Sequence, residues 1–298
     1  MREFIEILDC GILELISQDS KLEIISTGFL LTEGPVWNSK ENCLYFSDIP
    51  GNTIYQYSDR KGIEIYRKPS HFSNGLTLSR EFQIIACEHQ RRAISIQRGK
   101  NLEILCDHYQ NKRLNSPNDV IIAKDGSIIF TDPIYGLRDG QGGPAIRELP
   151  FQGVYRLPPG EKQPILICNN FERPNGLALN SSENCLYVDD TVRQHIRIFH
   201  IGNNWDITGG EVFTELIGKG VGRPDGMKLD IHDNIFCTGS GGIWVFNPSG
   251  KLLGKIQMPE KTANIAWGDE DRHSLFICSN TSLYRLRLQT LGKSPNDL

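Results

Sequence analysis

The amino-acid sequence predicts an all-β chain, a six-bladed β-propeller with four-stranded blades around a central channel, and two repeated patterns support this prediction. The first pattern is a polar residue, then Gly or another small or polar residue, then alternating apolar positions. Its copies are marked by Glu33, Asn74, Asn118, Asn175 and Asp225, with Ala263 marking a sixth that has lost the polar residue. The copies are 38 to 57 residues apart, which is the repeat length of a four-stranded propeller blade.

A short apolar run follows each copy of the first pattern. The sequence Glu-Asn-Cys-Leu-Tyr occurs twice verbatim, at 41–45 and 183–187. The corresponding runs in the other units lie at 84–88, 128–132, 235–238 and 275–278. Because these runs are bounded by Gly, Asn, Asp and Ser, they are predicted to be strands separated by turns.

The two ends of the chain are predicted to meet in the last blade. Residues 1–20 form an arm without a clear period, either a short helix or irregular. Residues 21–25 have strand composition, whereas no obvious fourth strand follows the strand predicted at 282–288. The N-terminal strand is therefore expected to complete the sixth blade and close the ring, which removes two exposed sheet edges.

The whole chain, residues 1–298, is expected to form one domain. Strands of the first unit are predicted at 33–37, 44–47, 53–57 and 62–66. The third unit is the longest, since it contains an insertion at 135–152 that is rich in Gly and Pro. An insertion of this length is predicted to be a lid over one mouth of the channel, with simple surface packing as the alternative. Residues 289–298 are expected to be a tail, frayed over 292–298.

Bulk composition excludes several classes of function. The formal net charge is -4 and no basic stripe occurs, so a nucleic acid is not an expected partner. No apolar run approaches the roughly 20 residues of a membrane span, and residues 1–16 are acidic where a signal peptide would be cationic. We therefore expect a soluble, cytoplasmic protein, and the sequence leaves its oligomeric state open.

The eight cysteines include no Cys-x-x-Cys pair. Four of them lie in the predicted second strands of the units, at Cys43, Cys87, Cys185 and Cys237. This favours small, buried, free side chains over a disulfide framework or a zinc site.

The first pattern also predicts a metal site. Since the innermost strand of each blade lines the axis, residues at one phase of the repeat converge there. The converging set contains two carboxylates and three amides, all oxygen donors. Such donors suit a hard divalent cation, Ca²⁺ above all, with Mg²⁺, Mn²⁺ or Zn²⁺ as alternatives. The competing interpretation is that Asn or Asp before Gly only forms turns, but Glu33 has no special turn preference.

Other catalytic patterns are absent from the sequence. No Gly-x-Ser-x-Gly elbow, His-Glu-x-x-His pair or phosphate-binding Gly-x-x-x-x-Gly-Lys loop occurs. The seven histidines share no phase of the repeat, so surface or hydrogen-bonding roles are expected for them.

Four groups of residues carry a resemblance to a known family. They are Glu-Gly-Pro-Val-Trp at 33–37, Ser-Pro-Asn-Asp-Val at 116–120 with Phe-Thr-Asp-Pro-Ile-Tyr-Gly at 130–136, Arg-Pro-Asn-Gly-Leu at 173–177 and Arg-Pro-Asp-Gly-Met at 223–227. In this order they resemble the senescence marker protein, gluconolactonase and luciferin-regenerating-enzyme family of six-bladed propellers. The likeness spans about residues 21–288 and is greatest to the microbial gluconolactonase branch.

The resemblance implies roles for individual residues. Glu33, Asn175 and Asp225 match the family's metal ligands, and Asp225 also matches its proposed general base, a role that Glu33 could share. Asn118 matches a residue that binds substrate at or near the metal.

Two further substrate contacts are expected where this chain departs from the animal members. Ser116 stands where those members carry an Arg, so Arg113 is expected to supply the guanidinium from the preceding turn. Tyr135 lies near the position of a substrate-contacting Glu in the animal branch, and it is expected to contact the substrate here.

The function that follows is a metal-dependent sugar lactonase. Such an enzyme hydrolyses an aldonolactone such as gluconolactone to the open-chain acid, with the cation as Lewis acid and Asp225 as general base. Two alternatives stay open: a hydrolase of another lactone or of a phosphotriester on the same scaffold, and a Ca²⁺-binding propeller without catalysis.

Overall fold

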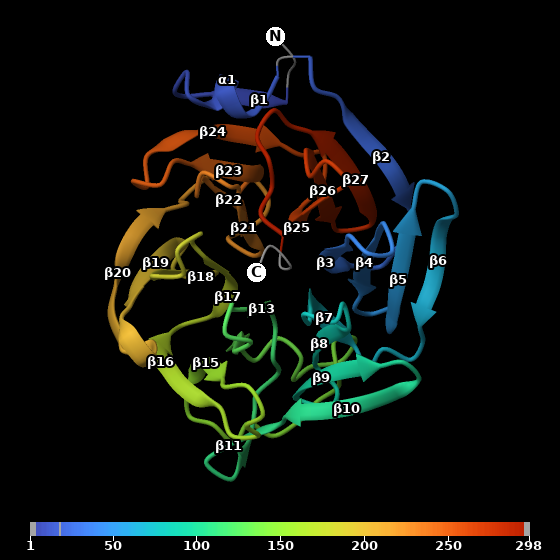
Figure 1. The fold of residues 1–298 in the computed structure, drawn as a ribbon, viewed down its shortest axis with the longest axis vertical. Helices are drawn as coiled ribbons and strands as arrows, with labels where there is room; N and C mark the ends of the chain where they lie inside the picture. The colour runs from blue at the N-terminus through green and yellow to red at the C-terminus, as the bar shows by residue number, and fades with distance from the viewer. Residues whose placement is uncertain (1–3, 18, 295–298) are drawn as a thin grey trace.

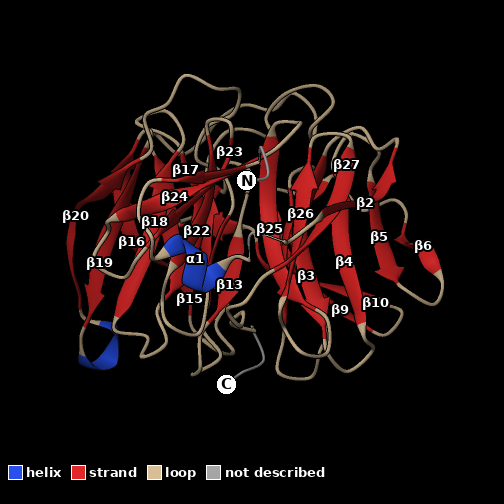
Figure 2. Cartoon of the chain, turned by 90° about the horizontal axis from the view of Figure 1, so that it is seen from above, coloured by secondary structure: helices blue, strands red, loops and turns tan. Residues whose placement is uncertain are grey.

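The protein is described by a computed structural model that covers residues 4–17 and 19–294. Six antiparallel sheets are arranged as blades around a central channel (Figure 1). Seen from the side, the strands run between two ends of the ring and the loops gather at those ends (Figure 2). The six-bladed propeller predicted from the repeat is confirmed.

The first four blades follow one another along the chain, each with its first strand innermost. Their strands are β3 (Thr32–Asn38), β4 (Cys43–Asp48), β5 (Thr53–Ser58) and β6 (Gly62–Arg67); β7 (Ser73–Leu78), β8 (Ile84–Glu88), β9 (Ala93–Arg98) and β10 (Asn101–Cys106); β13 (Val120–Ile122), β14 (Ile128–Asp132), β15 (Gln152–Leu157) and β16 (Ile165–Phe171); and β17 (Pro174–Leu179), β18 (Cys185–Asp190), β19 (His195–Ile201) and β20 (Ile207–Glu215). A small hairpin, β11 (His108–Tyr109) and β12 (Lys112–Arg113), lies between the second and third blades in sequence. A single 3-10 turn, η1 (Asn203–Trp205), joins β19 to β20.

The last two blades each include a strand from the N-terminal part of the chain. The fifth blade contains β21 (Met227–Leu229), β22 (Ile235–Gly239), β23 (Gly242–Phe246) and β24 (Leu252–Gln257), and the sixth contains β25 (Thr262–Gly268), β26 (Ser274–Ser279) and β27 (Ser282–Arg287). Strand β2 (Leu22–Thr27) pairs antiparallel with β27 as the fourth strand of the sixth blade. Closure of the ring by this strand is therefore confirmed.

The N-terminal arm is more ordered than its sequence indicated. Strand β1 (Ile5–Ile7) pairs with β24 as a fifth strand of the fifth blade. The short helix α1 (Ile12–Leu15) follows, and Ile12 is fully buried against the fifth and sixth blades. The strand was missed because three residues are too few to establish an alternating pattern, and its partner is about 250 residues away in the chain.

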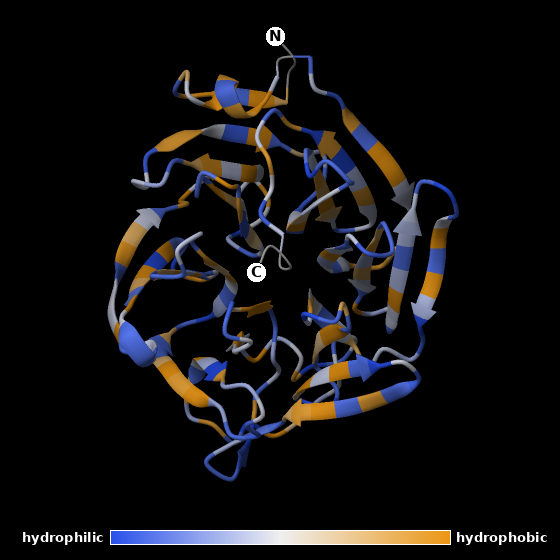
Figure 3. Cartoon of the chain, viewed as in Figure 1, coloured by the Kyte–Doolittle hydropathy of each residue, from blue (hydrophilic) through white to orange (hydrophobic). Residues whose placement is uncertain are grey.

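Buried apolar clusters fill the spaces between neighbouring blades. Each of the six interfaces has its own cluster, as where Val36 and Tyr45 of the first blade pack with Leu76 and Leu78 of the second. The second strands of the blades are buried on both faces, which explains their continuous apolar runs. Outermost strands such as β6 and β10 instead alternate apolar and polar residues (Figure 3).

The cysteines lie where the repeat placed them. All eight are free thiols, and Cys43, Cys87 and Cys237 are buried in β4, β8 and β22. Cys185 begins β18 and is only half-buried.

The C-terminal segment is bound to the ring over its described part, which corrects the expectation that the tail is frayed from residue 292. Thr290 Oγ1 donates to Asp230 Oδ2 at 2.8 Å, and Gly292 N donates to Arg272 O at 2.9 Å. A Cβ at Gly292 would lie 2.0 Å from the Trp267 ring, so this backbone fits closely against the sixth blade. The rest of that prediction, for 295–298, lies outside the described residues.

Within the described residues, no helix has the length and apolar character needed to cross a membrane.

Candidate functional site

The six positions that share the first phase of the repeat line one cavity at one end of the channel. Its volume is about 570 Å³. The first-phase residues that line it are Glu33, Asn74, Asn118, Asn175, Asp225 and Ala263. Four of them lie within the first two residues of an inner strand, whereas Asn118 and Asp225 lie two residues before β13 and β21. The repeat thus brings together residues that are far apart in sequence.

Glycines after the polar residues allow neighbouring inner strands to approach. A Cβ at Gly34 would lie 2.1 Å from the backbone oxygen of Asn74 in the next blade. A Cβ at Gly176 would lie 2.1 Å from the backbone oxygen of Asp225. Any larger residue would force the blades apart, so the Gly in the pattern is a packing requirement of the ring.

Hydroxyl groups at the ends of the second strands fix the same backbone from the neighbouring blade. Ser47 Oγ donates to Asn74 O at 2.8 Å, and Thr131 Oγ1 donates to Asn175 O at 2.9 Å. These buried bonds satisfy the carbonyl groups of cavity residues and hold those residues in register around the channel.

Two carboxyl groups meet in the cavity. Glu33 is buried and Asp225 is half-buried, and the two carboxyl groups are close enough for each to shift the pKa of the other. Burial and then repulsion from Asp225 raise the pKa of Glu33 well above its usual value. Burial likewise raises the pKa of Asp225 to about 6, against the opposing effect of Lys261. Without a bound cation, the pair therefore retains a proton between the two groups at mildly acidic pH.

The hydrogen bonds of Glu33 leave one of its oxygens for a partner in the cavity. Gly34 N and Asn264 Nδ2 both donate to Oε2, at 2.6 and 3.0 Å. Asn175 in turn lies close enough to the Asp225 carboxylate to lower its pKa. The three residues matched to metal ligands in the sequence thus line one cavity, with Asp225 near both Glu33 and Asn175.

The donor set fits a hard divalent cation. No group of three or more His, Cys, Asp or Glu side chains in the described part of the chain is arranged to hold a metal. The cavity instead combines two carboxylates with amide oxygens, which is the chemistry that Ca²⁺ accepts. Burial raises the pKa of both carboxyl groups, and a cation bound between them would stabilise their ionised forms.

A line of hydrogen-bonded amides borders the carboxylates. Asn74 Nδ2 donates to Asn118 Oδ1 at 2.7 Å, and Asn118 Nδ2 donates to Asn175 Oδ1 at 2.5 Å. Asn175 Nδ2 donates to Thr191 Oγ1 at 3.0 Å, and this hydroxyl donates to Pro224 O at 2.8 Å. The line runs across three blades and ends on the residue before Asp225.

Tyr135 lines the cavity, as do Arg138 and Gln141 from the same insertion. The Arg173 guanidinium lies over the Tyr135 ring at 5.1 Å from its centroid. Burial raises the pKa of the Tyr135 hydroxyl, so the group stays protonated and can donate to a bound oxygen. The insertion therefore contributes directly to the cavity wall.

Arg113 does not line the cavity. It lies in β12, where Glu148 Oε2 accepts from its backbone N at 2.8 Å, and its guanidinium contacts Arg91 O and Asp107. The expectation that it supplies a guanidinium to the substrate does not fit this position, because the hairpin turns the side chain toward its own neighbours. The cations that line the cavity are Arg138, Arg173, Arg223 and Lys261.

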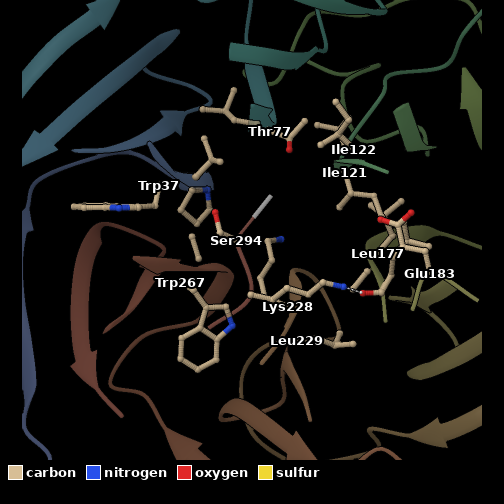
Figure 4. Close-up of a pocket in the computed structure, with 18 of the residues that line it drawn as sticks. Trp37, Thr77, Ile121, Ile122, Leu177, Glu183, Lys228, Leu229, Trp267 and Ser294 are labelled. Atoms are coloured by element: carbon tan, nitrogen blue, oxygen red, sulfur yellow. Dashed lines mark hydrogen bonds between the residues drawn. The ribbon is translucent and has the colours of Figure 1, made fainter. Parts of the chain in front are cut away.

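A second pocket lies at the other end of the inner strands and is mostly apolar. Trp37, Leu177, Leu229 and Trp267 are among the residues that line it (Figure 4). The C-terminal segment reaches this pocket, where Lys293 Nζ donates to Leu179 O at 3.0 Å. This end of the channel has none of the first-phase polar residues.

Comparison with known proteins identifies the group that shares this architecture. The sequence profile described as the SMP-30/Gluconolactonase/LRE-like region matches residues 31–281. The chain belongs to this family.

Individual members are similar over most of their length. The gluconolactonase of Zymomonas mobilis is 32% identical over 304 residues, which cover 93% of this chain and 84% of that protein. The pentonolactonase of Haloferax volcanii is 26% identical, covering 85% of this chain and 83% of its own. A solved gluconolactonase from Xanthomonas campestris superposes with a TM-score of 0.90 at 31% identity, covering 96% of this chain and 95% of that one. The resemblance predicted from the sequence motifs is confirmed.

Sequence reasoning missed other polar residues of this family member's cavity. Thr191 and His89 each follow the last residue of a second strand, β18 and β8. Thr191 lines the cavity, and His89 contacts Asn74. A signal for both existed, because they occupy one phase of the repeat; it was overlooked because the histidines were compared only with one another.

Proposed function

We propose that the chain hydrolyses an aldonolactone, gluconolactone or a close relative, to the open-chain acid. The observation that carries this proposal is that Glu33, Asn175 and Asp225 converge from three blades on one cavity large enough for a sugar ring. The names of the relatives support it, since two curated relatives that match most of the chain are named gluconolactonase and pentonolactonase.

One divalent cation belongs to this proposal, with Ca²⁺ preferred over Mg²⁺, Mn²⁺ and Zn²⁺. Glu33, Asn175 and Asp225 would hold it through oxygen atoms. When bound, it supplies Lewis-acid chemistry by drawing charge from the lactone carbonyl.

Asp225 is the proposed general base. Its carboxylate lines the cavity, where it can face the attacking water. It takes a proton from the attacking water while the water oxygen bonds to the carbonyl carbon. The bond from that carbon to the ring oxygen then breaks, and the ring oxygen leaves as a hydroxyl with the proton from Asp225.

Neighbouring side chains have separate parts in the proposal. Asn118 and Tyr135 would hold ring hydroxyls, because both line the cavity and offer hydrogen-bonding groups. The four cationic side chains that line it outnumber the two carboxylates. Their field favours the negative charge that develops on the carbonyl oxygen and then on the carboxylate product.

A panel of sugar lactones tests the proposal. Hydrolysis is followed by proton release, with metal-stripped protein and after addition of Ca²⁺, Mg²⁺, Mn²⁺ or Zn²⁺. We expect turnover of at least one aldonolactone and its loss after chelation. Cation binding by calorimetry without turnover of any lactone would instead indicate the non-catalytic alternative, and turnover that chelation leaves unchanged would remove the cation from the mechanism.

A further inference from the structure

His89 is buried between the cavity and the insertion of the third blade. It follows β8 and is only 1% exposed. Its Nδ1 lies 2.8 Å from the backbone oxygen of Gln141, in the insertion, and its Nε2 lies 3.3 Å from Asn74 Nδ2. A Cβ at Gly136 would lie 2.5 Å from the imidazole, so the insertion packs directly on this ring. The histidine therefore joins the insertion to the line of amides.

The two ends of this hydrogen-bonded line fix its direction. Both ends are backbone carbonyl groups, Gln141 O and Pro224 O, which can only accept. A line that ends on two acceptors must contain one group that donates in both directions.

The imidazole determines which group this is. Because Nδ1 faces a carbonyl oxygen, it must carry the hydrogen. Burial lowers the pKa of His89 to about 4, so the ring is neutral and Nε2 has only a lone pair. Asn74 Nδ2 then donates one hydrogen to His89 and the other to Asn118 Oδ1. The Asn74 amide is thus the group that donates in both directions.

The consequence is an acceptor without a partner. Asn74 is 4% exposed, lines the cavity, and its Oδ1 has no hydrogen-bond partner in the described chain. A buried amide oxygen of this kind is rare in native proteins unless a ligand completes it. Asn118 and Asn175 differ, because their oxygens already accept from the preceding amide.

We propose that His89 is a positioning residue that keeps the Asn74 carbonyl oxygen without a protein partner at the cavity wall, so that it can accept a hydrogen bond from a hydroxyl group of the sugar lactone. This inference rests on the proposed function for the identity of the ligand. The opposite tautomer would reverse the arrangement: Nε2–H would require the oxygen of Asn74, and the amide nitrogen would then be left for the ligand. The tautomer of His89 therefore determines that this part of the cavity binds a hydrogen-bond donor of the ligand and not an acceptor.

Two substitutions test the hydrogen bonds of the two ring nitrogens of His89 separately. In His89→Gln the amide oxygen can take the place of Nε2 and still accept from Asn74. In His89→Asn the amide nitrogen can take the place of Nδ1 and donate to Gln141 O, but no acceptor faces Asn74. His273→Asn is a matched control, because that imidazole also lies on backbone carbonyls, Leu288 O and Thr290 O, but away from the cavity.

Kinetics with a sugar lactone and its monodeoxy analogues test the positioning. We expect His89→Asn and Asn74→Ala to raise KM for the full lactone by about tenfold, the equivalent of one hydrogen bond. For one deoxy analogue, which lacks the partner hydroxyl, the same variants should match the wild type. His89→Gln should recover most of the loss, and His273→Asn should leave KM unchanged. Equal losses in both His89 variants for every analogue would overturn the proposal, because they would indicate a purely structural role.

A measurement independent of catalysis tests the direction of the bonds. Nitrogen NMR of ¹⁵N-histidine protein, with His89 assigned from the spectrum of His89→Gln, should give the Nδ1–H tautomer. An Nε2–H tautomer would overturn the inference even if the lactone kinetics agreed. If the wild type hydrolyses no lactone, the proposed function fails, but this spectrum still decides the orientation of Asn74. It also applies if His89→Asn fails to fold, since it uses the wild-type protein.

Discussion

At the scale of single residues, Glu33 and Asp225 have the same chemistry but different positions in the proposed reaction. Glu33 is held through Oε2 by two donors, whereas Asp225 contacts Asn175 and is open to the cavity. This difference predicts that Glu33 acts as a ligand and that Asp225 acts as both ligand and base.

The first prediction compares Glu33→Gln with Asp225→Asn. Both variants keep an oxygen for the cation but lose one negative charge, so both should bind it more weakly. Asp225→Asn should also lower kcat by about 10²- to 10⁴-fold at saturating cation, because no base replaces the carboxylate. Glu33→Gln should regain much of its rate with excess cation. The measurement is lactone hydrolysis across a cation titration, with binding followed by calorimetry.

The outcomes of this comparison separate the two roles. Full recovery of Asp225→Asn with added cation would exclude it as the base. Recovery of neither variant would mean that the two carboxylates act as a unit.

A second prediction concerns pH and the stability of the metal-free protein. The pKa of Glu33 is raised in the folded state, as is that of Asp225, to about 6. A carboxyl group with a raised pKa binds its proton more tightly when folded. Its contribution to stability is thus present at low pH and is lost as the pH rises through the folded pKa.

Cation binding should show the opposite trend, because a cation displaces the shared proton. The rise in melting temperature caused by Ca²⁺ is therefore expected to be small at about pH 5 and to grow toward neutral pH, above the Asp225 pKa near 6. Thermal unfolding with and without Ca²⁺ at each pH measures this effect. A shift that is constant with pH would contradict the assignment of these two groups as ligands.

At the scale of elements, the predictable parts of the site are those whose packing requires a particular residue type at a fixed place in each repeat. Close approach of inner strands requires Gly after the polar residue, as at Gly34 and Gly176, and this requirement repeats with each blade. The first-phase residues and the strands that carry them could therefore be found without a structure.

Other parts of the site depend on contacts that no local pattern encodes. Arg113 was expected at the substrate in place of the Arg that Ser116 replaces, but the hairpin of β11 and β12 directs it to Asp107. The repeat places His89 directly after a second strand, but its partners, Asn74 and Gln141, come from a different strand and from the insertion. Sequence distance gave no indication of either contact.

The insertion of the third blade provides the third prediction. The test replaces residues 138–145 by a short Gly-containing turn. The wider span of 135–152 is kept out of the deletion because it includes the buried Leu149 and the first residue of β15. We expect the shortened protein to keep its fold but to lose turnover or substrate preference, because Arg138 and Gln141 leave the cavity wall.

A surface change within the same insertion is the matched control. Ile146 is 86% exposed, so Ile146→Ser should alter neither stability nor kinetics. If the shortened protein hydrolyses lactones as well as the parent, the insertion is not a lid.

At the scale of the whole molecule, the N-terminal part of the chain joins the ring at two places. Strand β2 completes the sixth blade, and β1 with α1 covers the edge of the fifth. Both contacts link residues separated by most of the chain, so the ring closes only when β1 and β2 meet β24 and β27. Every sheet in this ring then packs against two neighbours, and we expect the chain to behave as one domain.

The last prediction tests this expectation far from the cavity. Ile12→Ala removes a fully buried side chain between the fifth and sixth blades, and such deletions cost about 2–5 kcal/mol. Leu8→Ala is the control, because Leu8 is 54% exposed. In urea, Ile12→Ala should unfold at a lower midpoint than Leu8→Ala, while KM and kcat in buffer stay unchanged for both.

The probes of unfolding decide whether the ring is one unit. Trp205 reports on the fourth blade, whereas Trp37, Trp244 and Trp267 report on the first, fifth and sixth. If the blades unfold together, fluorescence from a Trp205-only variant, circular dichroism and lactonase activity should all shift by the same amount in Ile12→Ala. A fourth blade that keeps its original midpoint while the fifth unfolds early would mean that β1 and α1 stabilise only their own edge of the ring.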